Sequence, residues 1–350
     1  MAYSCWLSIK DIHSGWCAVT NGQGFSCKFI SHVPTYMKIS WLISVLFQTE
    51  NNLFVTKMNK KFNFCNWGDM GKDLTLHLFM SLSIVDVIRC GSVCRSWREA
   101  SSDTELWKNI DLTKVDSLIV LQTWSDHIAM GTMNAIFRRG GDVSCLIFNY
   151  YFHMRDHYLI HVSKSMPKLK RLVLPAQYRV LKVARFEAAL KNWPELESLT
   201  IPCNFPVEIM EVIGKHCKKF SAMKLMCNFY ENHAEAVAAY LPNLKVLSLR
   251  CADKGAVLHI LKEMKHLQVL NLSHSYIVNH SPTLDRRMVV LRELDLQVTE
   301  PASRLERFIY CRSRLYCNTC RLQLSLNRVL IRCRYEERVW RMDEVSSLAH

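Results

Sequence analysis

The sequence lacks the short motifs that mark the common enzyme classes. It contains no Gly-x-Ser-x-Gly nucleophile elbow, no phosphate-binding loop, no dinucleotide fingerprint and no His-Glu-x-x-His metal motif. Each of these motifs positions a nucleophile, a phosphate or a metal ion, so their absence removes the sequence support for catalysis. We therefore predict a non-catalytic protein without a cofactor.

The chain also lacks a long apolar run and a recognisable secretory signal. Its longest apolar stretch, Ile39–Phe47, is far below the roughly 20 residues that a helix needs to cross a bilayer. The fifteen cysteines are odd in number and scattered from Cys5 to Cys333. We expect reduced thiols, no membrane contact and a cytoplasmic or nuclear location rather than a disulfide framework.

Acidic residues are scarce relative to basic ones. The net charge is +14 at pH 7, and residues 301–350 hold ten arginines against five acidic residues. This excess leaves a basic nucleic-acid-binding protein as one alternative. No recognisable nucleic-acid fold and no repeated base-stacking aromatic accompany the charge, so a basic surface for an acidic protein partner explains it at least as well.

Residues 1–60 differ from everything after them. They are rich in Cys, Trp and Phe but have no sustained helical or strand period. We expect an unstructured or artefactual N-terminal extension, with Met58 as a natural start. An amphipathic membrane anchor is the lesser alternative.

Residues 70–107 carry the pattern of three short helices. The first is predicted by apolar residues at four-residue steps, which line one side of a helix: Met70, Leu74, Leu78 and Leu82. The third helix has Val93, Cys94 and Trp97 on one face.

The second helix has recognisable signals at both ends. Ser83, three residues before Asp86, is typical of a capping box, in which the Ser83 hydroxyl accepts from an open amide and Asp86 reaches back. Gly91 is placed to end the helix, because glycine enters the left-handed cap conformation without steric cost.

Short signatures follow the first helix in a fixed order: Leu82-Ser83, Asp86-Val87-Ile88, Ser92-Val93-Cys94-Arg95-x-Trp97 and Leu106-Trp107. This order resembles an F-box, the adaptor-binding motif of modular ubiquitin ligases, and we place it at residues 65–112. Periodicity alone fits an ordinary helical bundle equally well. The family's usual Leu-Pro opening is Met70-Gly71 here; because proline preorganises the first turn, we expect a weaker start of the motif.

An apolar pattern recurs through the middle of the chain. Leu-x-x-Leu-x-Leu or a close variant begins at Leu169, Leu196, Phe220, Leu244, Leu267 and Leu291, with a weaker copy at Val143. The starts are 23 to 27 residues apart, which matches leucine-rich repeats of about 20 to 29 residues. Segments 186–193, 207–217, 234–241 and 255–264 suit short helices between strands. A conventional α/β sheet is the alternative.

The predicted fold class is therefore α/β: a three-helix F-box followed by a short leucine-rich-repeat solenoid, or horseshoe, with strands on its concave side. The repeats, about seven, occupy residues 113–300. An Arg/Cys-rich C-terminal cap and tail occupies residues 301–350.

Alternate strand positions should face the concave surface, where we expect a protein substrate to bind. These candidates form a polar, variable set: Arg171, Val173, Ser198, Thr200, Lys224, Met226, Val246, Ser248, Arg250, Val269, Asn271, Ser273, Glu293, Asp295 and Gln297. Cys203, Cys227 and Cys251 occupy one equivalent position past their strands, and we expect them in the core.

Two clusters have partial metal-ligand spacing. His153, His157 and His161 recur at four-residue steps, which also fits a solvated helix face. The cysteines 311, 317, 320 and 333 form C-x5-C-x2-C-x12-C, but the first spacing is irregular. We assign no metal, and keep one candidate zinc set: Cys311, Cys317, Cys320 and Cys333.

The combination of motifs, together with the tail segments Tyr335–Trp340 and Asp343–Leu348, is similar to the plant F-box/LRR-repeat proteins over residues 65–348. That resemblance implies an F-box docked on a Skp-type adaptor, which joins a cullin scaffold, and repeats that select a substrate for ubiquitination. The implied docking residues are Met70, Leu74, Leu78, Leu82, Val87, Ile88 and Val93. The implied F-box core is Phe79, Trp97 and Trp107. A repeat scaffold that does not recruit cullin is the alternative within this architecture.

Overall fold

The structure is a computed structural model of the 350-residue chain. It describes residues 16–21, 24–29, 70–113, 134, 136–152, 154, 156–176, 182–202, 204–280, 288–324, 338–339 and 341–349. The chain divides into two compact units, Met1–Leu106 and Trp107–His350. Within the described ranges, the structure has no helix of the length and apolarity that a membrane span requires.

Residues 1–60 contribute one described element, an antiparallel hairpin of β1 (Trp16–Asn21) and β2 (Gly24–Phe29). No strand period in the sequence predicts this pairing. The other residues of the segment, including Ile39–Phe47 and Met58, lie outside the described residues.

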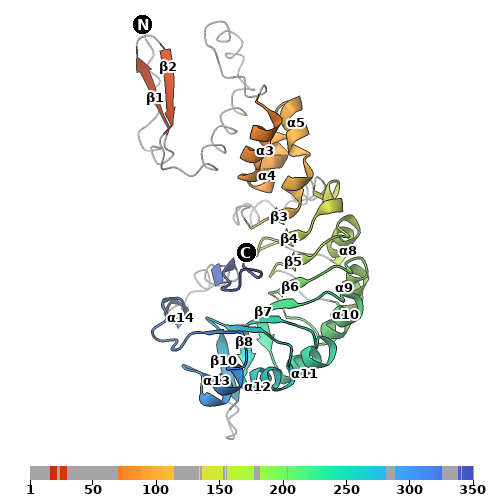
Figure 1. The fold of residues 1–350 in the computed structure, drawn as a ribbon, viewed down its shortest axis with the longest axis vertical. Coiled ribbons are helices and arrows are strands. Elements are labelled where there is room, and N and C mark those ends of the chain that lie inside the picture. The colour runs from red at the N-terminus through yellow and green to blue at the C-terminus, as the bar shows by residue number, and fades with distance from the viewer. Residues whose placement is uncertain are drawn as a thin grey trace. The chain divides into compact units, whose positions relative to one another are not determined.

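Three short helices follow in the first unit: α3 (Lys72–Met80), α4 (Ile84–Cys90) and α5 (Arg95–Ser101) (Figure 1). The buried rings of Phe79 and Trp97 join α3 to α5 edge to face, with centroids 5.5 Å apart. The predicted cap of α4 is confirmed, because the Ser83 Oγ accepts from the Asp86 N–H at 3.3 Å. The Asp86 carboxylate reaches back to the Ser83 hydroxyl at 2.7 Å and not to the backbone.

Gly91 ends α4, but the predicted left-handed conformation is wrong. Its φ and ψ are −63° and −11°, in the ordinary helical region. A Cβ here would lie 2.5 Å from the Ser101 Oγ of α5, so a larger residue would require that side chain to move. The close approach of α4 and α5, which spacing in the sequence does not reveal, therefore favours glycine.

The second unit is a ladder of parallel strands in chain order, after the 3-10 turn η3 (Thr104–Trp107). The strands are β3 (Asn109–Asp111), β4 (Cys145–Ile147), β5 (Arg171–Val173), β6 (Ser198–Ile201), β7 (Ala222–Phe229), β8 (Val246–Asp253) and β9 (Val269–Leu272). A second 3-10 turn, η4 (Gly140–Asp142), precedes β4. Each strand pairs with the next one along the chain.

Helices return the chain between strands and all lie on one side of the ladder (Figure 1). They are α8 (Asp156–Ser165), α9 (Val183–Leu190), α10 (Ile209–His216), α11 (Glu231–Tyr240) and α12 (Lys254–Glu263). One core position runs through the ladder in register and is fully buried in every copy: Leu146, Leu172, Leu199, Met223, Leu247 and Leu270. These are the second apolar positions of the predicted repeat, and the apolar pattern therefore locates six strands correctly.

The predicted last strand at Leu291, Leu294 and Leu296 is wrong. Leu296 is 77% exposed and begins α13 (Leu296–Ala302). The strand that pairs in parallel with β9 is β12 (Arg307–Tyr310). A hairpin of β10 (Tyr276–His280) and β11 (Met288–Val290) comes between them, and β10 pairs with the second half of β8. This insertion moves the next ladder strand further along the chain than the repeat spacing predicts.

The C-terminal part adds α14 (Asn318–Leu324) and the segment 341–349, which we call the tail. The tail lies on the strand side of the second unit, opposite the helices, in dark blue in Figure 1.

Candidate functional site

Two surfaces were predicted to bind partners, and the first lies on the helices of the first unit. Leu74 is 57% exposed on α3. Four other predicted docking residues are half-buried: Met70, Leu78, Ile88 and Val93. Leu82 and Val87 are 8% and 2% exposed, so they belong to the core and offer no docking surface in this conformation. The open part of the predicted set is therefore centred on Leu74 and Leu78, one helical turn apart.

Trp107, predicted to belong to the F-box core, is a buried residue at the boundary of the two units. It is the first residue of the second unit and is 1% exposed. The Arg139 guanidinium lies over its ring, 4.7 Å from the centroid. Such stacking on an indole face stabilises a buried ring, so Trp107 packs at the beginning of the ladder.

The second predicted surface is the side of the ladder that faces away from the core. Strand pairing places its residues in two rows, because parallel partners in register point to the same side. The first row is Arg171, Ser198, Ala222, Val246, Val269 and Arg307. The second row is Val173, Thr200, Lys224, Ser248, Asn271 and Ile309. Most of the predicted concave residues are thus brought together.

This surface is not open, because the tail covers it. The Asp343 side chain has no exposed area and lies against the centre of the second row. Its carboxylate accepts hydrogen bonds from the Ser248 hydroxyl at 2.9 Å, from the Arg250 guanidinium at 3.0 Å and from the Asn271 amide at 2.9 Å. The Lys224 Nζ lies 3.5 Å from the same carboxylate. One acidic side chain therefore engages four of the residues predicted to bind substrate.

Burial and charge act in opposite directions on Lys224. Its side chain has no exposed surface, and desolvation lowers the pKa of its ammonium to about 7, against the attraction of Asp343. The ammonium also donates to the Met342 carbonyl at 3.2 Å. Lys224 is thus a buried group held by the tail and has no free surface for a substrate.

An apolar contact seals the first row. Val345 and Leu348 of the tail pack with Ala222 and Val269, and the half-buried Val246 and Ile309 lie against them. At one end of the tail, Arg171 donates to the Ala349 carbonyl. At the other, Arg341 donates to the Thr113 carbonyl at 2.7 Å. In the middle of the tail, Arg307 of β12 donates to the Glu344 carbonyl at 3.4 Å. The tail therefore runs out from β3 to β12 and back to β5.

The remaining predicted concave residues have other environments. Ser198 and Thr200 are buried, and Met226 is half-buried against the apolar pair Ile147 and Val173. Ser273 is buried and its carbonyl accepts from Arg250 at 2.7 Å.

The assignment of Glu293, Asp295 and Gln297 to a strand face is wrong. Glu293 lies in a bend before α13, Asp295 is the residue at its N-terminal cap, and Gln297 is inside it. Asp295 and Gln297 bind the Lys254 ammonium of α12, which fastens α13 to its neighbour. These side chains stabilise the end of the ladder.

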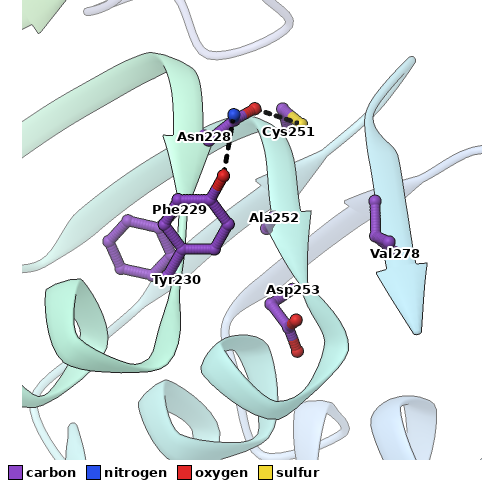
Figure 2. A pocket seen from close by; sticks show the side chains of 7 residues that line it. All are labelled: Asn228, Phe229, Tyr230, Cys251, Ala252, Asp253 and Val278. Carbon is purple, nitrogen blue, oxygen red and sulfur yellow. Dashed lines mark hydrogen bonds between the residues drawn. The ribbon is translucent and has the colours of Figure 1, made fainter. Parts of the chain in front are cut away.

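An open hollow lies at the C-terminal ends of β7 and β8, beside β10. Its volume is about 60 Å³, and it is lined by Asn228, Phe229, Tyr230, Cys251, Ala252, Asp253 and Val278 (Figure 2). The Asn228 side-chain Nδ2 donates to the Tyr230 hydroxyl at 3.0 Å, and the Cys251 thiol donates to the Asn228 side-chain Oδ1 at 3.0 Å. Tyr230 is 44% exposed.

The predicted core position of the three cysteines holds in part. Cys227 is buried, Cys251 is half-buried at the hollow, and Cys203 lies outside the described residues. Burial raises the pKa of the Cys251 thiol, which keeps it protonated.

The two metal candidates have different outcomes. His157 and His161 are exposed on α8, and His153 lies outside the described residues. Cys311, Cys317 and Cys320 are brought together, with His274 as a fourth member that the cysteine spacing does not reveal. Cys333 lies outside the described residues.

Comparison with known proteins identifies the class and then the family. Residues 72–113 match the model of the F-box-like family, which covers the three helices and the first strand of the ladder. An F-box/LRR-repeat protein of Arabidopsis thaliana is 33% identical over 297 residues, 81% of this chain and 96% of the relative. The chain belongs to the plant F-box/LRR-repeat protein family.

Two further Arabidopsis thaliana relatives are also F-box proteins by name. Putative F-box/LRR-repeat protein 22 is 27% identical over 236 residues, 63% of this chain and 73% of the relative. F-box protein SKIP19 is 28% identical over 233 residues, 63% of this chain and 74% of the relative.

Proposed function

We propose that this chain is a non-catalytic substrate-recognition subunit of an SCF-type ubiquitin ligase. Its F-box binds a Skp-type adaptor, which joins it to a cullin scaffold. Its ladder of strands and helices is a leucine-rich-repeat solenoid, a short horseshoe that binds a protein substrate for ubiquitination. The observation that carries this proposal is an F-box with open apolar side chains, joined to a repeat unit in a chain of the F-box/LRR-repeat family.

The adaptor surface follows from exposure on α3. Leu74 and Leu78 lie on one side of the helix, beside the buried face of Thr75 and Phe79. A small domain that leaves such side chains open gains stability when a partner covers them. Met80 is 61% exposed and lies roughly 120° around the same helix from Leu74, so it supplies a control.

The test is capture of a Skp-type adaptor by the full chain. Wild-type protein should capture the adaptor, and the double variant Leu74→Asp, Leu78→Asp should lose it. The single variant Met80→Asp adds a carboxylate on a different side of the helix and should retain capture; Leu74→Asp alone is its charge-matched counterpart and should weaken capture. If well-folded wild-type protein captures no adaptor, the ligase proposal fails and a repeat scaffold without cullin recruitment replaces it.

The substrate surface requires a revision of the sequence prediction. Asp343 and its partners form several charge-assisted hydrogen bonds, which are worth roughly 1.5–3 kcal/mol each. A substrate would have to replace all of them to reach the bare strands. We therefore propose the substrate contact at the hollow around Asn228 and Tyr230, two residues that are exposed.

Substrate capture can be compared between two substitutions, each added to the adaptor-deficient double variant. The adaptor-deficient double variant retains bound substrate without passing it to the ligase, so its co-purifying proteins define the candidates. Adding Tyr230→Asp should remove a specific partner from this set. Adding Tyr240→Asp, at an equally exposed tyrosine on α11, should not. The same partners in both sets would exclude the hollow. If nucleic acid co-purifies instead, and its binding falls steeply as the salt concentration rises, the nucleic-acid-binding alternative is favoured.

A further inference from the structure

Four metal-binding side chains meet at the C-terminal end of the ladder. His274 lies in the turn between β9 and β10, and Cys311 directly follows β12. Cys317 and Cys320 lie just before and inside the first turns of α14. Their ligand atoms all lie within 4.8 Å of one another. Two segments, the turn at His274 and the stretch that begins 37 residues later at Cys311, therefore converge on one point.

The spacing of these atoms matches one particular coordination geometry. The Cys311 Sγ lies 3.7 Å from the Cys317 Sγ and 3.8 Å from the Cys320 Sγ. The His274 Nδ1 lies 3.3, 3.3 and 3.7 Å from the three sulfurs. A tetrahedral zinc ion with Zn–S near 2.3 Å and Zn–N near 2.0–2.1 Å separates its sulfurs by about 3.8 Å and nitrogen from sulfur by about 3.5 Å. The thiols are too far apart for a disulfide, whose sulfurs are about 2.05 Å apart.

The backbone at His274 is held in an unusual conformation. Its φ is +56°, the left-handed region, and it is the single non-glycine residue with positive φ among the described residues. Its N–H donates to the Cys311 Sγ at 3.2 Å, and its ring points Nδ1 at the same sulfur. Such conformations persist where the surroundings require them, often at ligand sites. The turn therefore aims both the amide and the ring of His274 at the thiols.

The second nitrogen of the ring is also bound. The His274 Nε2 lies 3.1 Å from the Glu344 carboxylate of the tail. Metal-binding histidines usually donate their other N–H to a carboxylate, which fixes the tautomer and orients the ring. With Nε2 protonated toward Glu344, Nδ1 is left as a lone pair directed at the cluster.

We propose that His274, Cys311, Cys317 and Cys320 bind a structural zinc ion. Soft thiolates with one imidazole select zinc among the common divalent ions, and four protein ligands leave no open position for catalysis. The ion joins the end of the sheet to α14. Through Glu344 it also holds the tail across the rows of strand residues, so zinc binding supports the closure of that face.

The first measurement is the metal content of the full chain. The protein is expressed in medium that contains zinc and is then dialysed against a weak chelator, which removes loosely bound metal. One zinc per chain is expected by mass spectrometry. Cobalt substitution should give the visible bands of a tetrahedral thiolate site. Cys317→Ser should lose the bound metal, whereas Cys251→Ser, which changes a half-buried thiol outside the cluster, should retain it. Folded wild-type protein without metal, or stoichiometric zinc in Cys317→Ser, overturns the proposal.

A second variant does not depend on removing a ligand. Glu344→Ala should weaken zinc binding about 10- to 100-fold in competition with a chelator, because it removes the partner of the His274 ring. His274→Cys keeps four ligands and should retain zinc. In wild-type protein, a strong chelator should lower the melting temperature and speed hydrogen exchange in residues 341–349. If Glu344→Ala leaves the zinc affinity unchanged and the chelator leaves hydrogen exchange in residues 341–349 unchanged, zinc binding does not hold the tail.

Discussion

Arg250 of β8 donates a hydrogen bond of 3.0 Å to the carboxylate of Asp343, 93 residues later in the chain. Both side chains are almost fully buried, with 6% and 0% of their surface exposed. The pair lies at the centre of the contact between the tail and the ladder. Its charge balance determines how firmly the tail is held.

Replacing Asp343 should therefore be costly. Asp343→Asn keeps the shape of the side chain but leaves Lys224 and Arg250 without their counter-charge. Removing one partner of a buried ion pair typically costs about 3–5 kcal/mol. Urea denaturation of the full chain should give a loss of this order. Asp142→Asn, at an exposed carboxylate paired with Lys168, should leave the midpoint nearly unchanged; an equal loss in both variants would contradict a special role for Asp343.

The stability contributed by Lys224 should depend on pH. Its pKa is about 7 in the folded protein and near 10.5 when unfolded, because burial disfavours the ammonium. Between these values the unfolded chain binds more protons, so stability rises with pH through this group. Below pH 7 the ammonium is charged in both states and its desolvation cost is fully present. The unfolding free energy of the wild type minus that of Lys224→Met should increase from pH 7 to pH 10. A flat difference would mean that the ammonium is solvated.

Leu348 tests the apolar half of the same contact. Its side chain has no exposed surface and packs with Val345 against the first row of strand residues. Leu348→Ala leaves a cavity and should cost about 2–5 kcal/mol if the tail unfolds together with the ladder. Cleavage by a protease within residues 341–349 should also become faster. Leu296→Ala, at a leucine that is 77% exposed, should change neither measurement.

The repeat pattern predicts strands well because every copy must bury the same position. Leu172, Leu199 and Leu247 each lie beside an apolar residue at the equivalent position of the adjacent strand. The spacing of apolar residues in the sequence therefore predicts a contact between strands. Leu291 and Leu296 match the same pattern but form no ladder strand. The β10–β11 hairpin is inserted between β9 and the next ladder strand, β12, and the pattern contains no information about that insertion.

The candidate site was harder to predict for a different reason. The polar character of Lys224, Ser248 and Asn271 predicts a substrate surface, yet these residues bind Asp343. A cation among otherwise apolar strand positions indicates a buried acid, but nothing local says whether that acid belongs to a partner or to the chain. His274 escaped notice for a similar reason, because its ligand role depends on a turn 37 residues before Cys311.

Gly71 offers a test of the departure from the family's Leu-Pro opening. It is the N-cap residue of α3, with a φ of −54° that suits proline, and a Cβ there would meet no atom within 4 Å. Gly71→Pro removes freedom from the unfolded chain and should stabilise the F-box by about 0.4–1 kcal/mol. Gly91 has a similar φ of −63°, but its N–H donates to the Val87 carbonyl at 3.1 Å and its Cβ would strike Ser101. Gly91→Pro should therefore destabilise the same helices. Thermal unfolding and adaptor capture should be measured for both variants. A higher melting temperature in Gly71→Pro means that the chain lacks only the preorganising ring of proline. A lower melting temperature in both variants would mean that the start of α3 cannot accept the family's residue.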